Sequence, residues 1–316
     1  MKNQKILIIG GLGFIGSALV KKYYKDNKII VVDNQDYKSS PLGKMNLNSD
    51  NIEVLNGDAN EADFILSLDD DFDYIIHASA VLGIRIVGEQ SINTIKTNVV
   101  SCLNSLDLAV NQKKLKKYIT FSTSEIYGIN AHDSNENDPA IIEKPLEGRW
   151  CYAASKTLAE HLCFAYHREQ GINILIVRPF NVFGPYRKGT DAITTFVNKA
   201  LNNETIYIDG DGSQMRSWCY IDDFINGLCI AIENSEKAEI YNIGNPNNLI
   251  SITDLAKKIV GLCNSTSRVI IINSKEPDVK YRNLSIDKAK NNLHYNPNVS
   301  LDDGIKKVIE FKSKER

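Results

Sequence analysis

Residues 5–16 read Lys-Ile-Leu-Ile-Ile-Gly-Gly-Leu-Gly-Phe-Ile-Gly. The apolar start of this stretch is typical of a strand buried on both faces, and residues 14–26 have the apolar spacing of a helix. Gly10 and Gly13 allow a tight turn with close backbone approach, and Gly16 lets the helix pack closely on the strand. The free N–H groups at such a helix N-terminus bind phosphate, so the stretch predicts a cradle for a dinucleotide pyrophosphate.

A carboxylate follows at the position that such a cradle needs. The apolar run Ile29–Val32 ends at Asp33, which lies 17 residues after Gly16. A carboxylate there accepts hydrogen bonds from the hydroxyls of the adenosine ribose and repels a 2′-phosphate. The sequence therefore predicts NAD rather than NADP as the cofactor.

A second motif predicts proton transfer. Tyr152 and Lys156 are four residues apart, so they share one face of the helix expected over 152–170. The pKa of an unperturbed tyrosine is about 10, and a lysine ammonium and the positive nicotinamide would lower it toward the range of a useful base. The hydroxyls and carboxylate of Ser122–Glu125 follow the strand expected over 117–121, at the edge of the sheet where α/β proteins bind ligands.

Strands and helices alternate along the first half of the chain. The expected strands are 5–9, 29–33, 52–55, 73–77, 117–121 and 173–177, with helices between them, notably 92–111 and 152–170. This alternation predicts an α/β fold with a doubly wound parallel sheet, forming an NAD-binding domain over residues 1–178.

The pattern changes after residue 178. Loops rich in Gly, Asn and Asp separate irregularly spaced helices, which we expect at 192–202, 253–262 and 302–312. We interpret residues 179–316 as a smaller α/β substrate-binding domain. Its boundary is expected to be discontinuous, because a segment near 222–245 returns to the first domain.

Composition excludes several classes of protein. Among the 316 residues, 37 Lys and Arg oppose 39 Asp and Glu, giving a formal net charge of −2, which predicts no nucleic-acid partner. No apolar run is long enough to span a membrane, and the chain leads directly into its first strand, so we expect a cytoplasmic protein. The six cysteines and five histidines show no metal-ligand spacing, so no metal site is predicted.

Arginines are few and lie beside the motifs. Nine arginines accompany 28 lysines, and four of the arginines adjoin the motifs, namely Arg149, Arg178, Arg216 and Arg282. A guanidinium suits phosphate and carboxylate groups, so this placement favours an anionic substrate.

These motifs resemble those of the extended short-chain dehydrogenase/reductase family, in particular its enzymes that modify nucleotide-diphosphate sugars. The resemblance covers nearly the whole chain. It is carried by Gly10–Gly16, Asp33, Gly57–Ala59, His77–Ala80, Thr97–Val99, Ser122–Gly128, Tyr152 with Lys156, Arg178–Pro185, and Gly210–Gln214 followed by Arg216.

The resemblance implies a role for each matching residue. Tyr152 is the base, Lys156 supports it, Thr123 orients the sugar hydroxyl, and Asp58 lies by the adenine. The implied catalytic residues are Thr123, Ser124, Glu125, Tyr152 and Lys156. The implied cofactor-binding residues are Gly10, Gly13, Phe14, Ile15, Gly16, Asp33, Asn34, Asp58, Ala59, Ala78, Ala80, Asn98, Tyr152 and Lys156. The implied substrate-binding residues are Arg85, Arg149, Asn181, Arg216 and Arg282.

The resemblance also implies a Rossmann fold, a nucleotide-diphosphate sugar as substrate and a homodimer. In the family, two helices of each subunit form a four-helix bundle, and the matching helices here are 92–111 and 152–170.

The reaction is less closely defined. Thr123–Glu125 together with Arg149–Tyr152 looks most like the UDP-glucuronate decarboxylases, in which the residues matching Glu125 and Arg216 assist loss of the carboxylate. Sugar 4,6-dehydratases acting on dTDP-glucose typically carry Asp at the position of Ser124, and many 4-epimerases lack a carboxylate at that of Glu125. The segment Val81–Val87 departs from the decarboxylases, which leaves the sugar open.

The expected reaction is thus oxidation at carbon 4 of the sugar, followed by decarboxylation of the UDP-glucuronate type. A 4-epimerase and a net 4-dehydrogenase acting on a GDP- or UDP-sugar are the alternatives. A more remote reading is an NAD-binding regulator that has lost catalysis. Such proteins usually lose the Tyr/Lys pair, and this chain has both residues.

Overall fold

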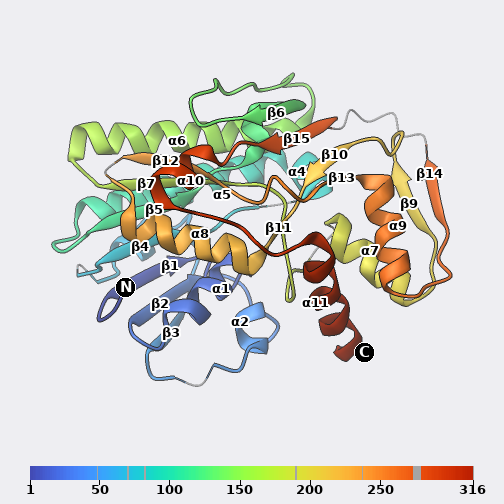
Figure 1. Ribbon diagram of the computed structural model, residues 1–316. Coiled ribbons are helices and arrows are strands. Elements are labelled where there is room, and N and C mark those ends of the chain that lie inside the picture. Colours follow the sequence, from blue (N-terminus) through green and yellow to red (C-terminus); the bar gives the residue numbers. More distant parts are fainter. Residues whose placement is uncertain are drawn as a thin grey trace. The chain divides into compact units, whose positions relative to one another are not determined.

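The computed structural model describes residues 1–47, 49–69, 71–81, 83–188, 191–236, 238–272 and 279–315 (Figure 1). The chain divides into two compact units. The first consists of Met1–Ile126, Ile142–Arg178 and Leu228–Tyr241, and the second of Tyr127–Ile141, Pro179–Gly227 and Asn242–Arg316.

The first unit is built on a seven-stranded sheet. Its strand order is β12-β7-β5-β4-β1-β2-β3, and the strands are β1 (Lys5–Ile9), β2 (Lys28–Asp33), β3 (Ile52–Asn56), β4 (Tyr74–His77), β5 (Lys117–Phe121), β7 (Ile174–Pro179) and β12 (Glu239–Ile243). The pairs from β3 through β1 to β7 are all parallel. The direction in which successive strands are added reverses between β1 and β4. Ligands bind at the carboxyl ends of the strands at such a switch point.

Helices of the first unit connect these strands. They are α1 (Phe14–Tyr23), α2 (Pro41–Lys44), α3 (Ala62–Leu66), α4 (Ile84–Glu89), α5 (Ser91–Val110) and α6 (Cys151–Gln170), with one-turn 3-10 helices at Ser124–Tyr127 and Gly148–Trp150. Helix α8 (Ile221–Asn234) continues from the second unit into the first. Helices α5 and α6 pack side by side, and the Tyr166 hydroxyl of α6 donates to Asp107 of α5.

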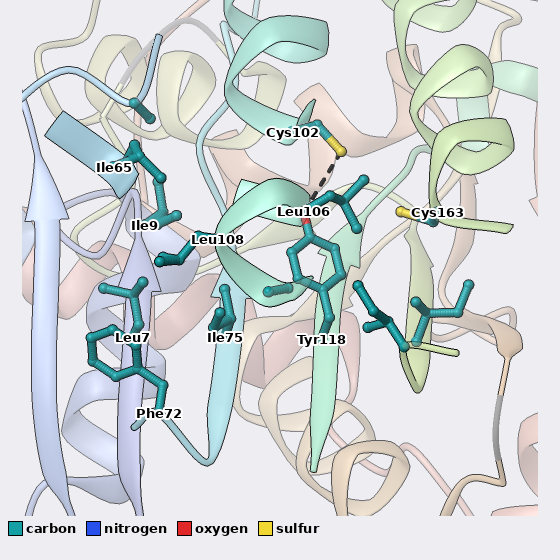
Figure 2. Close-up of a cluster of buried hydrophobic side chains, with 14 of the residues drawn as sticks. Leu7, Ile9, Ile65, Phe72, Ile75, Cys102, Leu106, Leu108, Tyr118 and Cys163 are labelled. Carbon is teal, nitrogen blue, oxygen red and sulfur yellow. Dashed lines mark hydrogen bonds between the residues drawn. The ribbon is translucent and has the colours of Figure 1, made fainter. Parts of the chain in front are cut away.

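A buried apolar cluster holds α5 and α6 on the sheet. Figure 2 shows part of it, including Cys102 of α5, Cys163 of α6 and Tyr118 of β5. The Tyr118 hydroxyl lies 2.8 Å from the Ser105 hydroxyl and 3.6 Å from the Cys102 sulfur, so the phenol is hydrogen-bonded inside the cluster. The cluster fixes the two helices that carry Asn98, Tyr152 and Lys156.

The second unit contains three small sheets. A four-stranded sheet has the order β13-β10-β15-β6, and two pairs of strands, β11 with β8 and β14 with β9, are parallel. The strands are β6 (Asn130–Ser134), β8 (Val182–Phe183), β9 (Ile206–Asp209), β10 (Met215–Ser217), β11 (Cys219–Tyr220), β13 (Leu249–Ser251), β14 (Val269–Ile272) and β15 (Tyr281–Leu284). The helices are α7 (Ala192–Leu201), α9 (Ile252–Leu262), α10 (Asp287–Leu293) and α11 (Leu301–Lys314).

The predicted fold class is confirmed, and most element bounds agree with the structure to within one or two residues. One exception is the first helix, which was expected over 14–26 and ends at Tyr23. The assignment of segments to the two units also differs at one place. Residues 127–141 fell within the predicted first domain, and the structure groups them with the second unit, where β6 pairs with β15. The expected return segment supplies β12 of the large sheet.

Two further observations concern the whole described chain. None of its helices is both long and apolar enough to cross a membrane. Its six cysteines are free thiols.

Candidate active site

The glycine turn between β1 and α1 packs directly against the loop that follows β4. Gly10 has a φ of +82°, and a Cβ placed on it would lie 2.6 Å from the Ser79 nitrogen and 2.7 Å from the Ala78 carbonyl carbon. Both neighbours are backbone atoms that cannot rotate away, so only glycine fits. Helix α1 begins at Phe14, immediately after Gly13, so the N–H groups of its first turn open onto this site.

Asp33 is held rigidly beside the glycine turn. One of its carboxylate oxygens accepts a hydrogen bond of 2.9 Å from the Leu12 N–H, and the other accepts one of 3.0 Å from the Gln35 N–H. Burial raises the pKa of Asp33, and hydrogen bonds from the backbone of Gln35, Leu12 and Asn34 oppose that rise. The turn and this carboxylate together fit a dinucleotide, because the N–H groups in the first turn of α1 suit a pyrophosphate and Asp33 has lone pairs left for a ribose.

The loop after β3 is ordered by its own side chains. One Asp58 oxygen accepts 2.9 Å hydrogen bonds from both the N–H and the amide of Asn60. The Asn104 amide of α5 donates 3.0 Å to the carbonyl of Ala59. Asp58 and Ala59, both predicted to bind the cofactor, therefore have fixed backbone positions.

Tyr152 and Lys156 lie on one face of α6, as their spacing predicts. Both side chains are buried, and the Lys156 nitrogen lies 6.0 Å from the centre of the Tyr152 ring. Burial lowers the pKa of Lys156 to about 8. Helix α6 thus places a phenol next to an ammonium whose pKa of about 8 lies only a little above neutral pH.

Three candidate catalytic residues follow β5 in the same unit. Thr123, Ser124 and Glu125 enter a 3-10 helix, and the Thr123 hydroxyl accepts a 3.2 Å hydrogen bond from the Glu125 N–H. Thr123 and Ser124 are buried, whereas Glu125 is half-buried. The short helix therefore holds two hydroxyls and one carboxylate at the carboxyl end of β5.

Asn98 connects three segments around α6. Its amide oxygen accepts a 3.2 Å hydrogen bond from the Val81 N–H, and its amide nitrogen donates 3.0 Å to the Ser155 hydroxyl. Ser155 in turn donates 2.8 Å to the carbonyl of Tyr152. Asn98 thus supports the helix of the Tyr/Lys pair, and only a tertiary contact reveals this link.

The arginines of the first unit have different surroundings. Arg149 lies over the Trp150 ring, with 4.7 Å between guanidinium carbon and ring centre. Arg85 has 83% of its side chain exposed and lies 3.9 Å from Glu89. Arg178, which the sequence grouped with the anion-binding arginines, instead binds Glu160 through two buried hydrogen bonds of 2.8 and 2.6 Å.

The other candidate arginines belong to the second unit. Arg216 of β10 and Arg282 of β15 are register partners in adjacent parallel strands, so their buried side chains leave the sheet on the same face. Arg216 donates to the carbonyls of Met215 and Val279. Asn181, with a φ of +41°, donates 2.8 Å to the Ser217 carbonyl.

His77 was interpreted from the sequence as a packing or hydrogen-bonding residue. Its two ring nitrogens lie 2.8 Å from the Ser101 hydroxyl and 3.3 Å from the Thr120 hydroxyl. Over the described ranges, no three His, Cys, Asp or Glu side chains gather as they would around a metal ion.

Comparison with known proteins agrees with this geometry. The model of the "NAD dependent epimerase/dehydratase family" matches residues 6–244. The chain is 31% identical over 318 residues to UDP-N-acetyl-alpha-D-glucosaminuronate decarboxylase of Bacillus cytotoxicus, covering 98% of each chain. It is 33% identical over 317 residues to UDP-glucuronic acid decarboxylase 5 of Arabidopsis thaliana, covering 96% of this chain and 87% of that one.

Solved structures show the same fold. UDP-glucuronic acid 4-epimerase from Bacillus cereus, in complex with UDP-glucuronic acid and NAD, superposes with a TM-score of 0.89 at 29% identity, over 99% of this chain and 100% of that one. The NAD prediction from the glycine turn and Asp33 is confirmed by the family match and by such NAD complexes. The chain belongs to the NAD-dependent epimerase/dehydratase family and is an enzyme of the extended short-chain dehydrogenase/reductase class.

Proposed function

We propose that the enzyme oxidises carbon 4 of the sugar of a UDP-hexuronate and then removes the carbon 6 carboxylate, as a decarboxylase of the UDP-glucuronate type. The observation that carries the oxidation is the buried Tyr152–Lys156 pair on α6. The uronate is favoured because relatives covering nearly the whole chain are named as decarboxylases of UDP-uronates.

The first step needs a base and a support for that base. NAD held by the glycine turn and Asp33 would supply a hydride acceptor for carbon 4 and the hydride that is returned at the end of the cycle. Tyr152, as phenolate, takes the proton of the 4-hydroxyl, and the Lys156 ammonium lowers the pKa of that phenol. Thr123 has a hydroxyl that orients the same sugar hydroxyl, and its position is fixed by the Glu125 N–H.

Decarboxylation follows from the chemistry of the oxidised sugar. A ketone at carbon 4 makes the uronate a β-keto acid. The bond between carbons 5 and 6 breaks, carbon dioxide leaves, and the electron pair passes to the carbon 4 oxygen as an enolate. Hydrogen-bond donors at that oxygen stabilise the enolate. Carbon 5 then takes a proton, for which Glu125 is the proposed carrier.

The arginines of the second unit suit the anionic parts of the substrate. Arg216 and Arg282 place two guanidinium groups on one face of adjacent strands. Two like charges side by side create a potential that favours an anion, and guanidinium binds phosphate in a bidentate manner. We assign them, with Asn181, to the diphosphate or the uronate carboxylate. Arg149 and Arg85 remain candidates from the first unit, the latter less favoured because of its exposure.

A 4-epimerase is the second candidate. It is favoured by the structural likeness to UDP-glucuronic acid 4-epimerase. Such an enzyme would oxidise the same carbon and return the hydride to the opposite face, without loss of carbon.

The distinguishing experiment supplies UDP-glucuronate and, separately, UDP-N-acetylglucosaminuronate to the NAD-loaded enzyme. A decarboxylase releases one carbon dioxide per product with no lasting NADH. An isomer of unchanged mass would instead show epimerisation, and one NADH per 4-keto product would show net dehydrogenation. Absence of any product or NADH with either sugar would contradict the proposed uronate substrate.

Glu125→Gln tests the later step. The variant keeps the shape of the side chain and removes its ability to carry a proton, so we expect NADH and a 4-keto sugar to accumulate on the enzyme. Glu169→Gln at the exposed end of α6 is the matched control and should form normal product. Normal product from Glu125→Gln would restrict Glu125 to shaping the pocket and would contradict its proposed role as proton carrier.

We also propose that the enzyme is a homodimer formed through α5 and α6. Ile92 and Ile95 of α5 and Leu158 of α6 are exposed by 75%, 45% and 48%. Large apolar side chains on neighbouring helices favour burial against a second copy. Leu158→Lys should shift sedimentation toward the monomer, whereas Ile270→Lys on β14 should leave it unchanged. A dimer that persists in Leu158→Lys with Ile92→Lys would exclude this interface.

A further inference from the structure

A buried ion pair begins one helical turn after Lys156 in α6. Arg178, in β7, donates to both carboxylate oxygens of Glu160 in α6, at 2.8 and 2.6 Å. The side chains of Glu160 and Arg178 are only 10% and 6% exposed. Burying two charges costs about as much free energy as their attraction returns. Such a pair therefore adds little to the stability of the fold, and another role for it can be sought.

The helical register places Glu160 next to the lysine. Tyr152, Lys156 and Glu160 follow one another at intervals of four residues along α6, so the three side chains share one face. The order along this face is a phenol, an ammonium and a carboxylate, and Arg178 fixes the carboxylate at its far end.

Titratable groups from three elements face Lys156. His77 of β4 faces the lysine, and burial lowers its pKa to about 3, so its ring is neutral. The sulfurs of Cys102 and Cys163 also face it. A hydrogen bond donated by the Cys163 thiol to the Cys102 sulfur raises the pKa of Cys163 and lowers that of Cys102. Cys102, Cys163 and then the carboxylate of Glu160 oppose the effect of burial on the pKa of Lys156.

We propose that Glu160, held in place by Arg178, is a positioning residue that keeps the buried Lys156 side chain charged and directed along α6 toward Tyr152. This inference rests on the proposed roles of Tyr152 and Lys156 in oxidation at carbon 4. Glu160 touches neither the substrate nor the cofactor in this scheme and acts through the lysine.

The main test is the pH profile of NADH formation on the enzyme with UDP-glucuronate. The alkaline limb of this profile reports loss of the Lys156 ammonium. In Glu160→Gln the lysine loses a nearby negative charge and keeps the positive Arg178, so we expect the limb to move about one pH unit lower. Glu160→Asp should restore part of the shift. The double variant Glu160→Gln with Arg178→Met removes both charges of the ion pair. It should therefore shift the limb less than Glu160→Gln does, which leaves the positive Arg178 in place.

Two controls separate charge from packing. Glu169→Gln removes an exposed carboxylate from the same helix and should leave the limb in place. Cys102→Ala removes a thiol that faces Lys156 and should move the limb less than Glu160→Gln does. If both Glu160 variants fold and lose rate equally at every pH, the pair has a structural role and the proposal is overturned. A shift in Cys102→Ala equal to that expected for Glu160→Gln would overturn it as well.

A second readout does not need the sugar. In the NAD-loaded enzyme, ultraviolet absorbance follows formation of the Tyr152 phenolate as the difference from Tyr152→Phe. The midpoint should move to higher pH in Glu160→Gln, because a neutral Lys156 no longer stabilises the phenolate. A shifted midpoint in an enzyme that turns over no uronate would refute the proposed function and leave this inference standing. An unshifted midpoint would refute the inference alone.

Discussion

Replacing Gly10 by alanine tests whether the glycine turn is shaped by contact as well as by backbone conformation. At φ +82° an alanine costs about 1–2 kcal/mol, because its Cβ approaches its own carbonyl oxygen. The new Cβ would also lie 2.6–2.8 Å from backbone atoms of Ser79 and Ala78. Forcing such an overlap apart typically costs about a further 1–3 kcal/mol.

A matched control removes the contact and keeps the conformation. Gly171, at the end of α6, has a φ of +72° and no atom within 4 Å of the position of a Cβ. Gly171→Ala should therefore lose only the conformational part, about 1–2 kcal/mol. The difference between the two variants, about 1–3 kcal/mol, isolates the contact between the turn and the loop after β4.

The assay combines thermal unfolding with NAD titration by calorimetry. Each kcal/mol should lower the unfolding midpoint by about 2–4 °C in a domain of comparable size. Gly10→Ala should also bind NAD at least about tenfold more weakly, since a loss of 1.4 kcal/mol has that effect, whereas Gly171→Ala should bind it normally. Equal midpoints and equal NAD affinities for the two variants would refute the steric argument.

Three further predictions concern the same unit. Asp33→Ala should weaken NAD binding and narrow the preference over NADP, measured by titration with both cofactors; equal affinity of the unmodified enzyme for the two would contradict the assignment. Tyr152→Phe should retain NAD binding and lose about a hundredfold or more in NADH formation, and an almost unchanged rate would mean that another group is the base. Turnover should fall as the pH rises through about 8, where Lys156 loses its proton. Because the folded lysine has the lower pKa, its contribution to the free energy of unfolding should rise between pH 8 and the ordinary lysine pKa of about 10.4, and Lys156→Met should abolish this rise.

The parts of the site that the sequence predicts correctly are those set by local geometry. The turn at Gly10 depends on a backbone angle that few other residues adopt, and the strand before it is a continuous apolar run. The shared face of Tyr152 and Lys156 follows from the helical period alone. None of these features requires knowledge of which distant segments meet.

The parts that the sequence does not reveal depend on packing between elements. Asn98 and Ser155 are 57 residues apart and meet only because α5 and α6 lie side by side. Arg178 begins the motif Arg178–Pro185, and its position beside that motif favoured an anionic substrate as its partner. Its partner in the structure is the Glu160 carboxylate of α6. Strand β6 has no clear alternation of apolar and polar residues, and its pairing with β15 joins segments about 150 residues apart.

The residues proposed for oxidation at carbon 4 lie in one unit, whereas the arginines proposed for substrate binding come from both units. The glycine turn, Asp33, Tyr152 and Lys156 all belong to the first unit, so oxidation at carbon 4 depends on the packing of one rigid sheet and its helices. Arg216 belongs to the second unit, whose short strands and loops carry little of that packing. Family members can therefore keep the oxidation step while residues outside the sheet decide which sugar binds and what becomes of its ketone, which explains why relatives of similar identity are named both as decarboxylases and as epimerases.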